Sequence, residues 1–232
     1  MGIQLGNPDH PVHRLAVCHE VNDDVVASLE EDPVDLLITY HPLLFTPTTR
    51  LVAGRSPGSR SWRLIRLGVS LLVTHTDFDA APGGAADALA AFFDLADSQP
   101  FGGDADSGLG DIGRHGTFTG TVGTIDAMIS DAFGHVGVRV SGDRRAEVEH
   151  VAVVPGSGSR LIPIAAEVAQ VLVTGDVPHH RAVEARDLGL MVVDPGHTAT
   201  ERPGMLALVE MVRAVTDAEV VDLTAIDPQT WD

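Results

Sequence analysis

Short apolar runs alternate with amphipathic segments along most of the chain. Runs of Val, Leu and Ile that end in Gly, Pro or a polar residue are typical of buried strands, and longer segments with apolar residues three or four positions apart are typical of helices. The sequence predicts strands at 13–18, 35–39, 70–74, 135–142, 150–156, 171–175, 190–194 and 219–223. It predicts helices at 22–31, 59–68, 85–95, 124–134, 159–169, 180–189 and 205–216.

This alternation predicts an α/β fold. Near-continuous apolar runs indicate strands that are covered on both faces, so we expect mixed, mostly buried sheets with helices between the strands. The stretch 94–116 is rich in Gly and Asp and is predicted to be a loop or hinge. We therefore expect two interlinked α/β units, residues 1–116 and 117–232, with a single intimately packed domain as the alternative.

Several predicted strands end in histidines and carboxylates. Open α/β sheets place their chemistry just beyond the carboxyl ends of the strands, so these positions are the candidate site. The groups, in chain order, are Tyr40 and His41; His75, Asp77 and Asp79; Asp176, His179 and His180; and Asp194, His197 and Glu201.

Imidazole and carboxylate ligands without thiolate suit Zn, Mn, Fe, Co or Ni. His75 and Asp79 are four residues apart, and so are His197 and Glu201. That spacing would place each pair on one face of a helix. A proline follows each pair closely, however, so we expect the helices to begin later and both pairs to lie on loops. A carboxylate such as Glu201 can bridge two metal ions, and two ions about 3.5–4 Å apart form a common hydrolytic centre.

Each of these residues also has a purely structural interpretation. A single histidine at a strand end can be an ordinary hydrogen-bonded loop residue, and His179 and His180 open a predicted helix, where capping is common. Asp176 and Asp77 are typical turn or cap residues, and Asp194 could anchor the turn that follows it.

Two further motifs are weaker evidence for a functional site. The GSGS turn at 156–159 lies between a strand and a helix, where backbone amides could hold an anion, although such a turn usually reflects only tight geometry. It lacks the third glycine of a dinucleotide fingerprint, and neither of its serines, Ser157 and Ser159, has the setting of a serine hydrolase. Cys18 beside His19 resembles a nucleophile with its base, but adjacent strand residues point to opposite faces, which argues against the pair.

The chain is strongly acidic. Its 232 residues include 33 Asp and Glu but only 15 basic residues, all of them Arg, which gives a net charge of −18. Such a charge repels phosphate backbones and anionic lipids, so we expect neither a nucleic-acid nor a membrane partner. The lack of Lys fits either a GC-rich genome or a halophilic source, since in molar salt the Debye length falls to about 3 Å and an acidic surface is tolerated.

Cysteine usage and hydropathy indicate a cytoplasmic protein. Cys18 is the single cysteine of the sequence, so an internal disulfide is excluded. The sequence has no run of about 18 apolar residues that would predict a membrane helix. The start of the chain also lacks the basic and apolar regions of a signal peptide.

Five motifs, taken in order, resemble those of one known family. They are GIQLG, DLLITYHPLLF, THTDFDAAPGGAADALA, VTGDVPHHRAVEA and DPGHTATERPG. In this set the chain is similar to the Nif-three-like proteins, which are described as dinuclear metal-centre proteins or as GTP cyclohydrolase I type 2 homologues. The resemblance covers nearly the whole chain. It implies two α/β units with a di-metal site between them, and a toroidal homohexamer built as a trimer of dimers.

The resemblance implies roles for individual residues. His41 matches the second histidine of the family's His-His-Pro element, and Asp79 matches the carboxylate of its His-Thr-x-x-Asp element. His197 and Glu201 match its Gly-His-x-x-x-Glu element, with Glu201 as the bridging ligand. These four residues would hold two divalent metal ions per subunit. His75 matches a histidine that lies beside the site and orients a ligand.

The chain departs from the family pattern at two places. Tyr40 stands where many members have the first histidine of the pair, and a neutral phenol with a pKa of about 10 is a poorer ligand than imidazole. One of the two ions would therefore be held weakly, be held through water, or be of another kind. The chain also begins at GIQLG, where members usually have a preceding helix, which indicates a short N-terminus or a misplaced start codon.

Three functional hypotheses follow from the resemblance. The first is a metal-dependent hydrolase, similar to a cyclohydrolase, that acts on a nucleotide-like or phosphorylated small molecule. Metal-bound water would be its nucleophile, and His75 and Tyr40 are candidates for a place beside the metal. The second is a non-catalytic metal-binding scaffold in which the ring-shaped assembly matters more than turnover. The third is a nucleotide-sensing protein.

Overall fold

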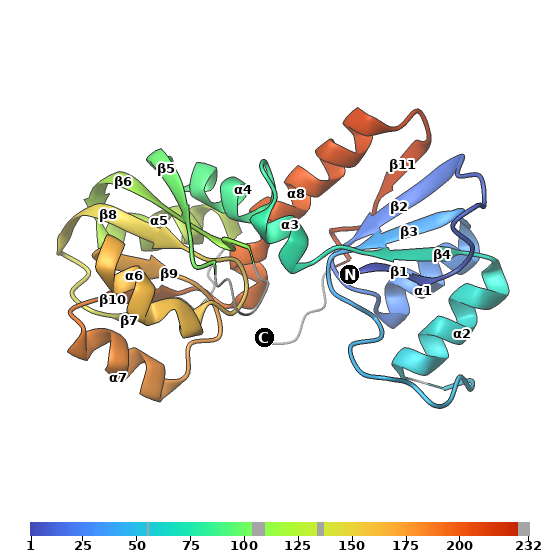
Figure 1. The fold of residues 1–232 in the computed structure, drawn as a ribbon, viewed down its shortest axis with the longest axis horizontal. Coiled ribbons are helices and arrows are strands. Elements are labelled where there is room, and N and C mark those ends of the chain that lie inside the picture. The colour runs from blue at the N-terminus through green and yellow to red at the C-terminus, as the bar shows by residue number, and fades with distance from the viewer. Residues whose placement is uncertain (55, 104–109, 134–136, 227–232) are drawn as a thin grey trace. The chain divides into compact units, whose positions relative to one another are not determined.

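The chain packs into two compact units in a computed structural model that describes residues 1–54, 56–103, 110–133 and 137–226 (Figure 1). One unit contains Met1–His75 together with Leu208–Asp232, and the other contains Thr76–Ala207. The division predicted from the sequence, at residues 116 and 117, follows the order of the chain and stays a prediction. The predicted α/β class is confirmed, because both units are built on mixed sheets covered by helices.

The first unit is built on a mostly parallel sheet. Its strands lie in the order β1 (Gly2–Leu5), β4 (Ser70–Val73), β3 (Leu36–Thr39), β2 (Arg14–Cys18) and β11 (Glu219–Asp222). β1 is antiparallel to β4, and the other neighbours run parallel to one another. In parallel strands the carboxyl ends meet at one edge of the sheet, so the residues after β2, β3 and β4 are brought to the same edge.

Two helices of the first unit, α1 (Asp23–Glu31) and α2 (Pro57–Leu67), share one apolar core with the sheet. The core contains Ala16, Leu37 and Leu71 of the strands, Val25, Val26 and Leu29 of α1, and Leu64 of α2. The predicted cap of α1 is confirmed, because the Asn22 side chain accepts a hydrogen bond from the N–H of Val25.

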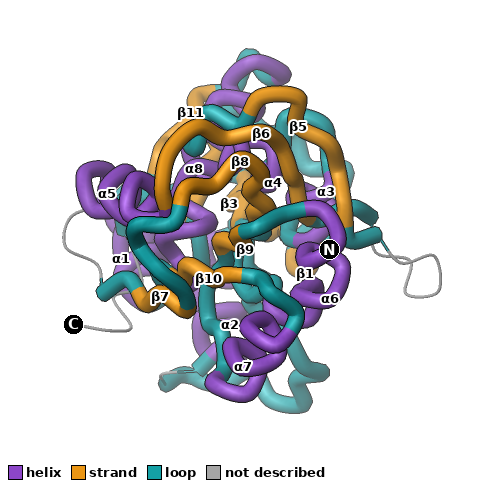
Figure 2. Tube along the Cα trace, turned by 90° about the vertical axis from the view of Figure 1, so that its left-hand side faces the viewer, coloured by secondary structure: helices purple, strands orange, loops and turns teal. Residues whose placement is uncertain are grey.

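The second unit has a sheet of mixed direction. Its strands lie in the order β5 (Ala96–Phe101), β6 (Gly113–Thr121), β8 (Glu147–Val153), β9 (Val171–Val173), β10 (Met191–Asp194) and β7 (Arg139–Ser141). β8, β9 and β10 run parallel, side by side as Figure 2 shows, and the remaining neighbours are antiparallel.

Helices cover both faces of the second sheet. α4 (Ala85–Phe92) and α5 (Val122–Phe133) share one core with Val171 and Val173, while α6 (Ile162–Val168) and α7 (His179–Asp187) share the other with Leu172. A one-turn helix, η1 (Ser159–Leu161), leads into α6. Successive residues of β9 therefore enter opposite cores, as the two-residue period of a strand requires. The predicted burial on both faces is confirmed for this sheet.

The segment 94–116, predicted to be a loop or hinge, contains strand at both of its sides. It includes β5 and the beginning of β6, while residues 102, 103 and 110–112 are irregular and residues 104–109 lie outside the described residues. The prediction is wrong for β5, an edge strand whose residues are nearly all exposed and which therefore lacks an apolar pattern. Gly113 lies in the strand pairing, where a Cβ would lie 2.4 Å from the Phe101 ring.

Two helices complete the chain, α3 (Thr76–Ala80) and α8 (His197–Val215). The predicted Gly83–Gly84 turn separates α3 from α4, and Gly84 cannot carry a side chain because a Cβ would lie 1.8 Å from the carbonyl oxygen of Phe78. α8 contributes residues up to Ala207 to the second unit and residues from Leu208 to the first. Among the described residues, no helix is both long and apolar enough to cross a membrane.

Replacing Asn22 with Ala removes the acceptor that caps α1. We expect the free energy of unfolding to fall by about 1 kcal/mol, because the Val25 N–H loses its 2.8 Å hydrogen bond at the helix start. Urea denaturation of wild type and variant measures the loss. Asn22→Asp keeps an oxygen acceptor and is the matched control; an equal loss in both variants would show that the cap does not stabilise α1.

Candidate metal centre

The ends of β2 and β3 bring a group of ring side chains together in the first unit. The register pairs Cys18 with Thr39, and the pairing continues beyond the strands, because the N–H of Tyr40 donates to Cys18 O at 3.2 Å and the N–H of His41 to His19 O at 2.9 Å. His19, Tyr40 and His41 therefore leave the sheet at the same edge.

The rings of this edge lie close to one another. From the His41 ring centroid, the centroids of His19, Tyr40 and His75 lie 4.8, 5.0 and 5.5 Å away. The metal-ligating nitrogens of His19 and His41 lie within 4.8 Å of each other. His19 and Tyr40 are buried, at 3% and 1% exposed, and His41 is half-buried. The structure thus brings together the predicted residues Tyr40, His41 and His75.

His19 is not among the ligands that the sequence pattern predicts. The sequence places His19 next to Cys18 in the chain. Side chains alternate between the two faces of a strand, so the two residues are not expected to act as a pair. The usable signal is its place directly after β2, which corresponds to that of Tyr40 after β3. Cys18 itself is fully buried, and burial raises the pKa of its thiol to about 12, so the argument against a thiolate nucleophile is supported.

His75 occupies an unusual backbone conformation just after β4. Its φ of 150° is rare for a residue other than glycine. The preceding residue is held in the sheet, because the N–H of Thr74 donates to Thr39 O at 2.9 Å. Such strain persists only where the surrounding structure fixes it, and it often accompanies a functional site.

In the second unit, His197 and Glu201 form a close pair at the start of α8. Nε2 of His197 lies 3.0 Å from Oε1 of Glu201, and Nδ1 lies 2.8 Å from Oδ2 of Asp176. Glu201 is 2% exposed, while about a third of the His197 side chain is exposed. One imidazole is therefore held between two carboxylates.

The prediction that both pairs lie on loops is wrong for His197 and Glu201, because α8 begins at His197 and places them one helical turn apart. Pro203 lies inside α8, where it removes one backbone donor and crowds the carbonyl of Ala199, yet the helix continues through it. Tertiary contacts hold the first turn, since the Thr200 hydroxyl donates to His197 O and accepts from the N–H of Gly156. The sequence pattern cannot show these contacts.

The loop prediction is also wrong for Asp79, which lies in the short helix α3 and is 5% exposed. His75 precedes that helix, as predicted. Asp77 accepts a hydrogen bond from the next residue's N–H, which agrees with its local interpretation. His179 and His180 are exposed at the start of α7, where the sequence places them.

Two residues shape the surroundings of the His197 pair. Gly156 has a φ of 61°, and a Cβ there would lie 2.6 Å from Oε1 of Glu201. Asp194 anchors the turn before α8, as predicted, because it accepts hydrogen bonds from the N–H groups of Gly196 and Val177 and from Arg139.

The GSGS turn is explained by tight geometry. The N–H of Gly156 donates to the Thr200 hydroxyl at 2.9 Å, and that of Gly158 donates to the Thr174 hydroxyl at 2.8 Å. These two amides are already used inside the protein. This observation does not favour the anion-binding interpretation of the turn.

The electrostatics of the pair favour a charged imidazole. The hydrogen bond with Glu201, assisted by that with Asp176, raises the pKa of His197 to about 9, although partial burial opposes the shift. A divalent ion bound at Nε2 would have to displace this proton.

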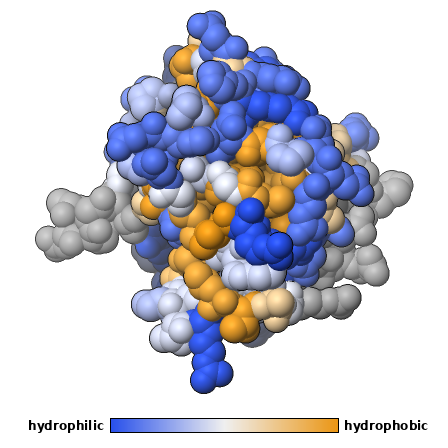
Figure 3. Space-filling view, turned by 90° about the vertical axis from the view of Figure 1, so that its right-hand side faces the viewer, coloured by the Kyte–Doolittle hydropathy of each residue, from blue (hydrophilic) through white to orange (hydrophobic). Residues whose placement is uncertain are grey.

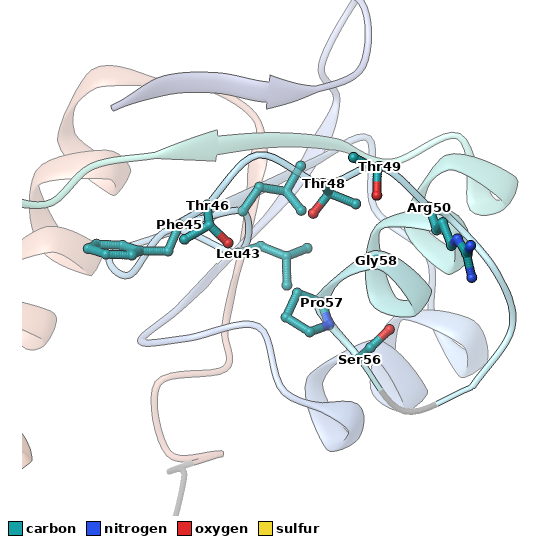
Figure 4. Close-up of a pocket in the computed structure, with 10 residues that line it drawn as sticks. Leu43, Phe45, Thr46, Thr48, Thr49, Arg50, Ser56, Pro57 and Gly58 are labelled. Atoms are coloured by element: carbon teal, nitrogen blue, oxygen red, sulfur yellow. The ribbon is translucent and has the colours of Figure 1, made fainter.

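A cavity of about 350 Å³ lies in the segment that follows His41, and its lining includes Leu43, Thr48, Arg50 and Pro57 (Figure 4). No predicted ligand lines it. The same segment exposes Phe45, Leu51 and Val52. Figure 3 shows apolar side chains gathered among hydrophilic ones on one face of the molecule.

NMR titration of the metal-free protein tests the His197 pair. We expect the His197 ring to titrate near pH 9 and to move toward 6.5 in Glu201→Gln, which removes the largest cause of the shift. The pKa of His197 is higher in the folded protein than in the unfolded chain. The contribution of the charged pair to folding stability is therefore complete below pH 6.5 and is lost as the pH rises through 9. Titration near 6.5 in the wild type would contradict the pairing.

Gly156→Ala is predicted to disturb the same pair, and Gly189→Ala is its control. Both residues have positive φ, at 61° and 77°, so both variants carry a backbone cost of about 1–2 kcal/mol. A Cβ at position 189 meets nothing within 4 Å, whereas at 156 it displaces the Glu201 carboxylate. We expect a lowered His197 pKa in Gly156→Ala alone; an unchanged value there would show that Glu201 is not confined by this turn.

Residues 1–230 match the Duf34/NIF3 family (NGG1p interacting factor 3). A GTP cyclohydrolase 1 type 2 homolog of Streptomyces coelicolor is 32% identical over 99% of this chain and 86% of its own length. One from Clostridium perfringens is 26% identical over 98% of this chain and 89% of its own length. Both alignments cover almost the entire chain.

Solved structures show the same fold. Reduced HcgD from Methanocaldococcus jannaschii has a TM-score of 0.80 at 29% identity and covers 96% of this chain and 88% of its own. A Staphylococcus aureus protein has a TM-score of 0.87 at 22% identity and covers all of this chain and 91% of its own. The arrangement of elements is therefore one that solved proteins also adopt.

Proposed function

Because the chain belongs to the Duf34/NIF3 family, we propose that it is a divalent-metal-dependent hydrolase of a nucleotide-like or phosphorylated small molecule. The observation that carries the proposal is the pair formed by the half-buried His197 imidazole and the buried Glu201 carboxylate. Relatives named GTP cyclohydrolase 1 type 2 homolog support the nucleotide-like substrate class.

The donor set fits a metal centre. Buried carboxylates are normally paired or bound to a cation, and Glu201 and Asp79 are 2% and 5% exposed. His41, Asp79, His197 and Glu201 would hold the two divalent ions per subunit that the resemblance implies. Nitrogen and oxygen donors suit Zn, Mn, Fe, Co or Ni.

A bound divalent ion would act as a Lewis acid and lower the pKa of water, which is the chemistry that hydrolysis needs. Residues of this chain would orient the ligand and transfer a proton in such a reaction. Asp176 accepts a hydrogen bond from Nδ1–H of His197 and fixes the ring, so Nε2, beside Glu201, is the nitrogen that would bind a metal ion in place of its proton. His75 and Tyr40 lie within ring contact of each other, where His75 is placed to move a proton and Tyr40 to orient it.

The assembly and location follow the same resemblance. A toroidal homohexamer in the cytoplasm stays a prediction, which sedimentation of the purified protein and cell fractionation test. A monomer at micromolar concentration would contradict the ring.

Removing the Glu201 carboxylate is the decisive test of the function. With Mn²⁺, Zn²⁺ or Co²⁺ supplied, we expect the wild type to hydrolyse GTP or a phosphodiester, and kcat/KM to fall at least about 100-fold in Glu201→Gln. Glu210→Gln is the matched control on the same helix, because Glu210 is exposed and pairs with Arg213. It should retain wild-type turnover and metal content.

Metal analysis separates the alternatives. A wild type that stays free of metal after metal-replete growth and direct titration would overturn the proposal. Bound metal with an intact oligomer but no turnover across nucleotides and phosphodiesters would favour the scaffold. Nucleotide binding without product would favour the sensor.

A further inference from the structure

We infer that His19 is a metal ligand of this chain and supplies, from the end of β2, the second imidazole that Tyr40 does not supply at the end of β3. The inference rests on the proposed metal centre and adds a ligand to it. It concerns the ring group of the first unit, formed by His19, Tyr40, His41 and His75.

The backbone holds His19 beside His41 firmly. His19 O accepts hydrogen bonds from the N–H of His41 at 2.9 Å and from the Thr39 hydroxyl at 3.3 Å. These bonds extend the parallel pairing of β2 and β3 beyond the last strand residues. His19 thus belongs to the rigid edge of the sheet, the kind of support that metal ligands require.

The side chains of His19 and His41 already lie near a ligating arrangement. Their ring centroids are 4.8 Å apart, and their ligating nitrogens lie within 4.8 Å of each other. A metal bound at about 2.0–2.1 Å from each nitrogen requires a separation of no more than about 4.2 Å. The present separation of at most 4.8 Å therefore exceeds this limit by no more than about 0.6 Å.

The chemistry of Tyr40 explains why a second imidazole is needed at this edge. Tyr40 is 1% exposed, and a neutral phenol with a pKa of about 10 is a poor ligand for a divalent ion. Its ring packs 5.8 Å from that of His19 and 5.4 Å from that of His75. Tyr40 therefore packs against both imidazoles, while His19 offers a nitrogen.

A structural histidine is the competing interpretation, and it makes different predictions. A structural His19 could change metal affinity when replaced, but it would leave the number of imidazoles bound to the ion unchanged. A ligand contributes a nitrogen directly to the ion. The imidazole count, rather than affinity or activity alone, therefore separates the two.

The test uses Co²⁺ and Zn²⁺ as probes of the purified full-length chain. We expect His19→Ala to raise the Kd for Co²⁺ at least about tenfold, since even residues behind the ligands contribute 10–100-fold. X-ray absorption at the Zn edge should count one imidazole fewer. His150→Ala is the control, because His150 is exposed on β8, in the other unit.

Tyr40→His in the His19→Ala background provides a rescue. It restores an imidazole at the same sheet edge, and we expect the Co²⁺ Kd to return to within about tenfold of the wild type. If His19→Ala fails to fold, as circular dichroism would show, ring ¹⁵N shifts of the wild type decide instead. The His19 ring nitrogens should shift on Zn²⁺ addition while those of His150 do not.

An unchanged imidazole count in folded His19→Ala, whatever the Co²⁺ Kd, or an unshifted His19 ring, would overturn the His19 inference and leave the proposed function standing. A wild type that binds neither Co²⁺ nor Zn²⁺ would overturn the proposed function as well. The two failures are therefore distinguishable.

Discussion

The burial of the Glu201 carboxylate is the constraint on which the candidate centre depends. A buried ionised carboxylate is costly unless it is paired or bound to a cation, and His197 is held one helical turn away at 3.0 Å. The surrounding contacts serve this pair: Gly156 leaves room for the carboxylate, and Asp194 fixes the turn before α8. Asp176 then orients the imidazole from its other nitrogen. A site that holds a proton in the metal-free state is suited to exchange it for a cation.

The fold was largely predictable, because the elements that were predicted correctly are those with a clear period. The apolar run 171–173 enters two cores alternately, and Asn22 caps α1 as its residue type indicates. The errors have physical causes. The strand β5 was missed because it is an exposed edge strand without an apolar pattern. A helix begins at His197 despite the proline at 203, because a long-range hydrogen bond from Gly156 to Thr200 and the local turn at Asp194 hold its start.

The candidate site was predictable only in part. The four-residue spacing indicated that His197 and Glu201 share one face of a helix. The proline that follows them led instead to the prediction of a loop, which is wrong. His19 was missed because its proximity to His41 depends on which strands pair, and that is a tertiary property. Asp176 was interpreted as a turn residue, and its φ of 54° agrees, but its contact with His197 crosses 21 positions of sequence. The sequence around a residue indicates its local backbone geometry, but not its contacts with residues far away along the chain.

The candidate metal-binding groups of the two units differ in their charge. The first unit gathers imidazoles and a phenol at the ends of β2, β3 and β4. Imidazole binds a metal ion as a neutral donor, whereas a phenol binds well only after it loses its proton. In the second unit, the carboxylates of Asp176 and Glu201 flank the imidazole of His197, and the buried carboxylate of Asp79 lies in α3. Carboxylates offset the charge of a divalent ion, and imidazoles supply neutral nitrogen. The tyrosine at position 40 leaves the edge of the first sheet without one neutral nitrogen donor, and the imidazole of His19 on the adjacent strand can supply a nitrogen there without changing the charge.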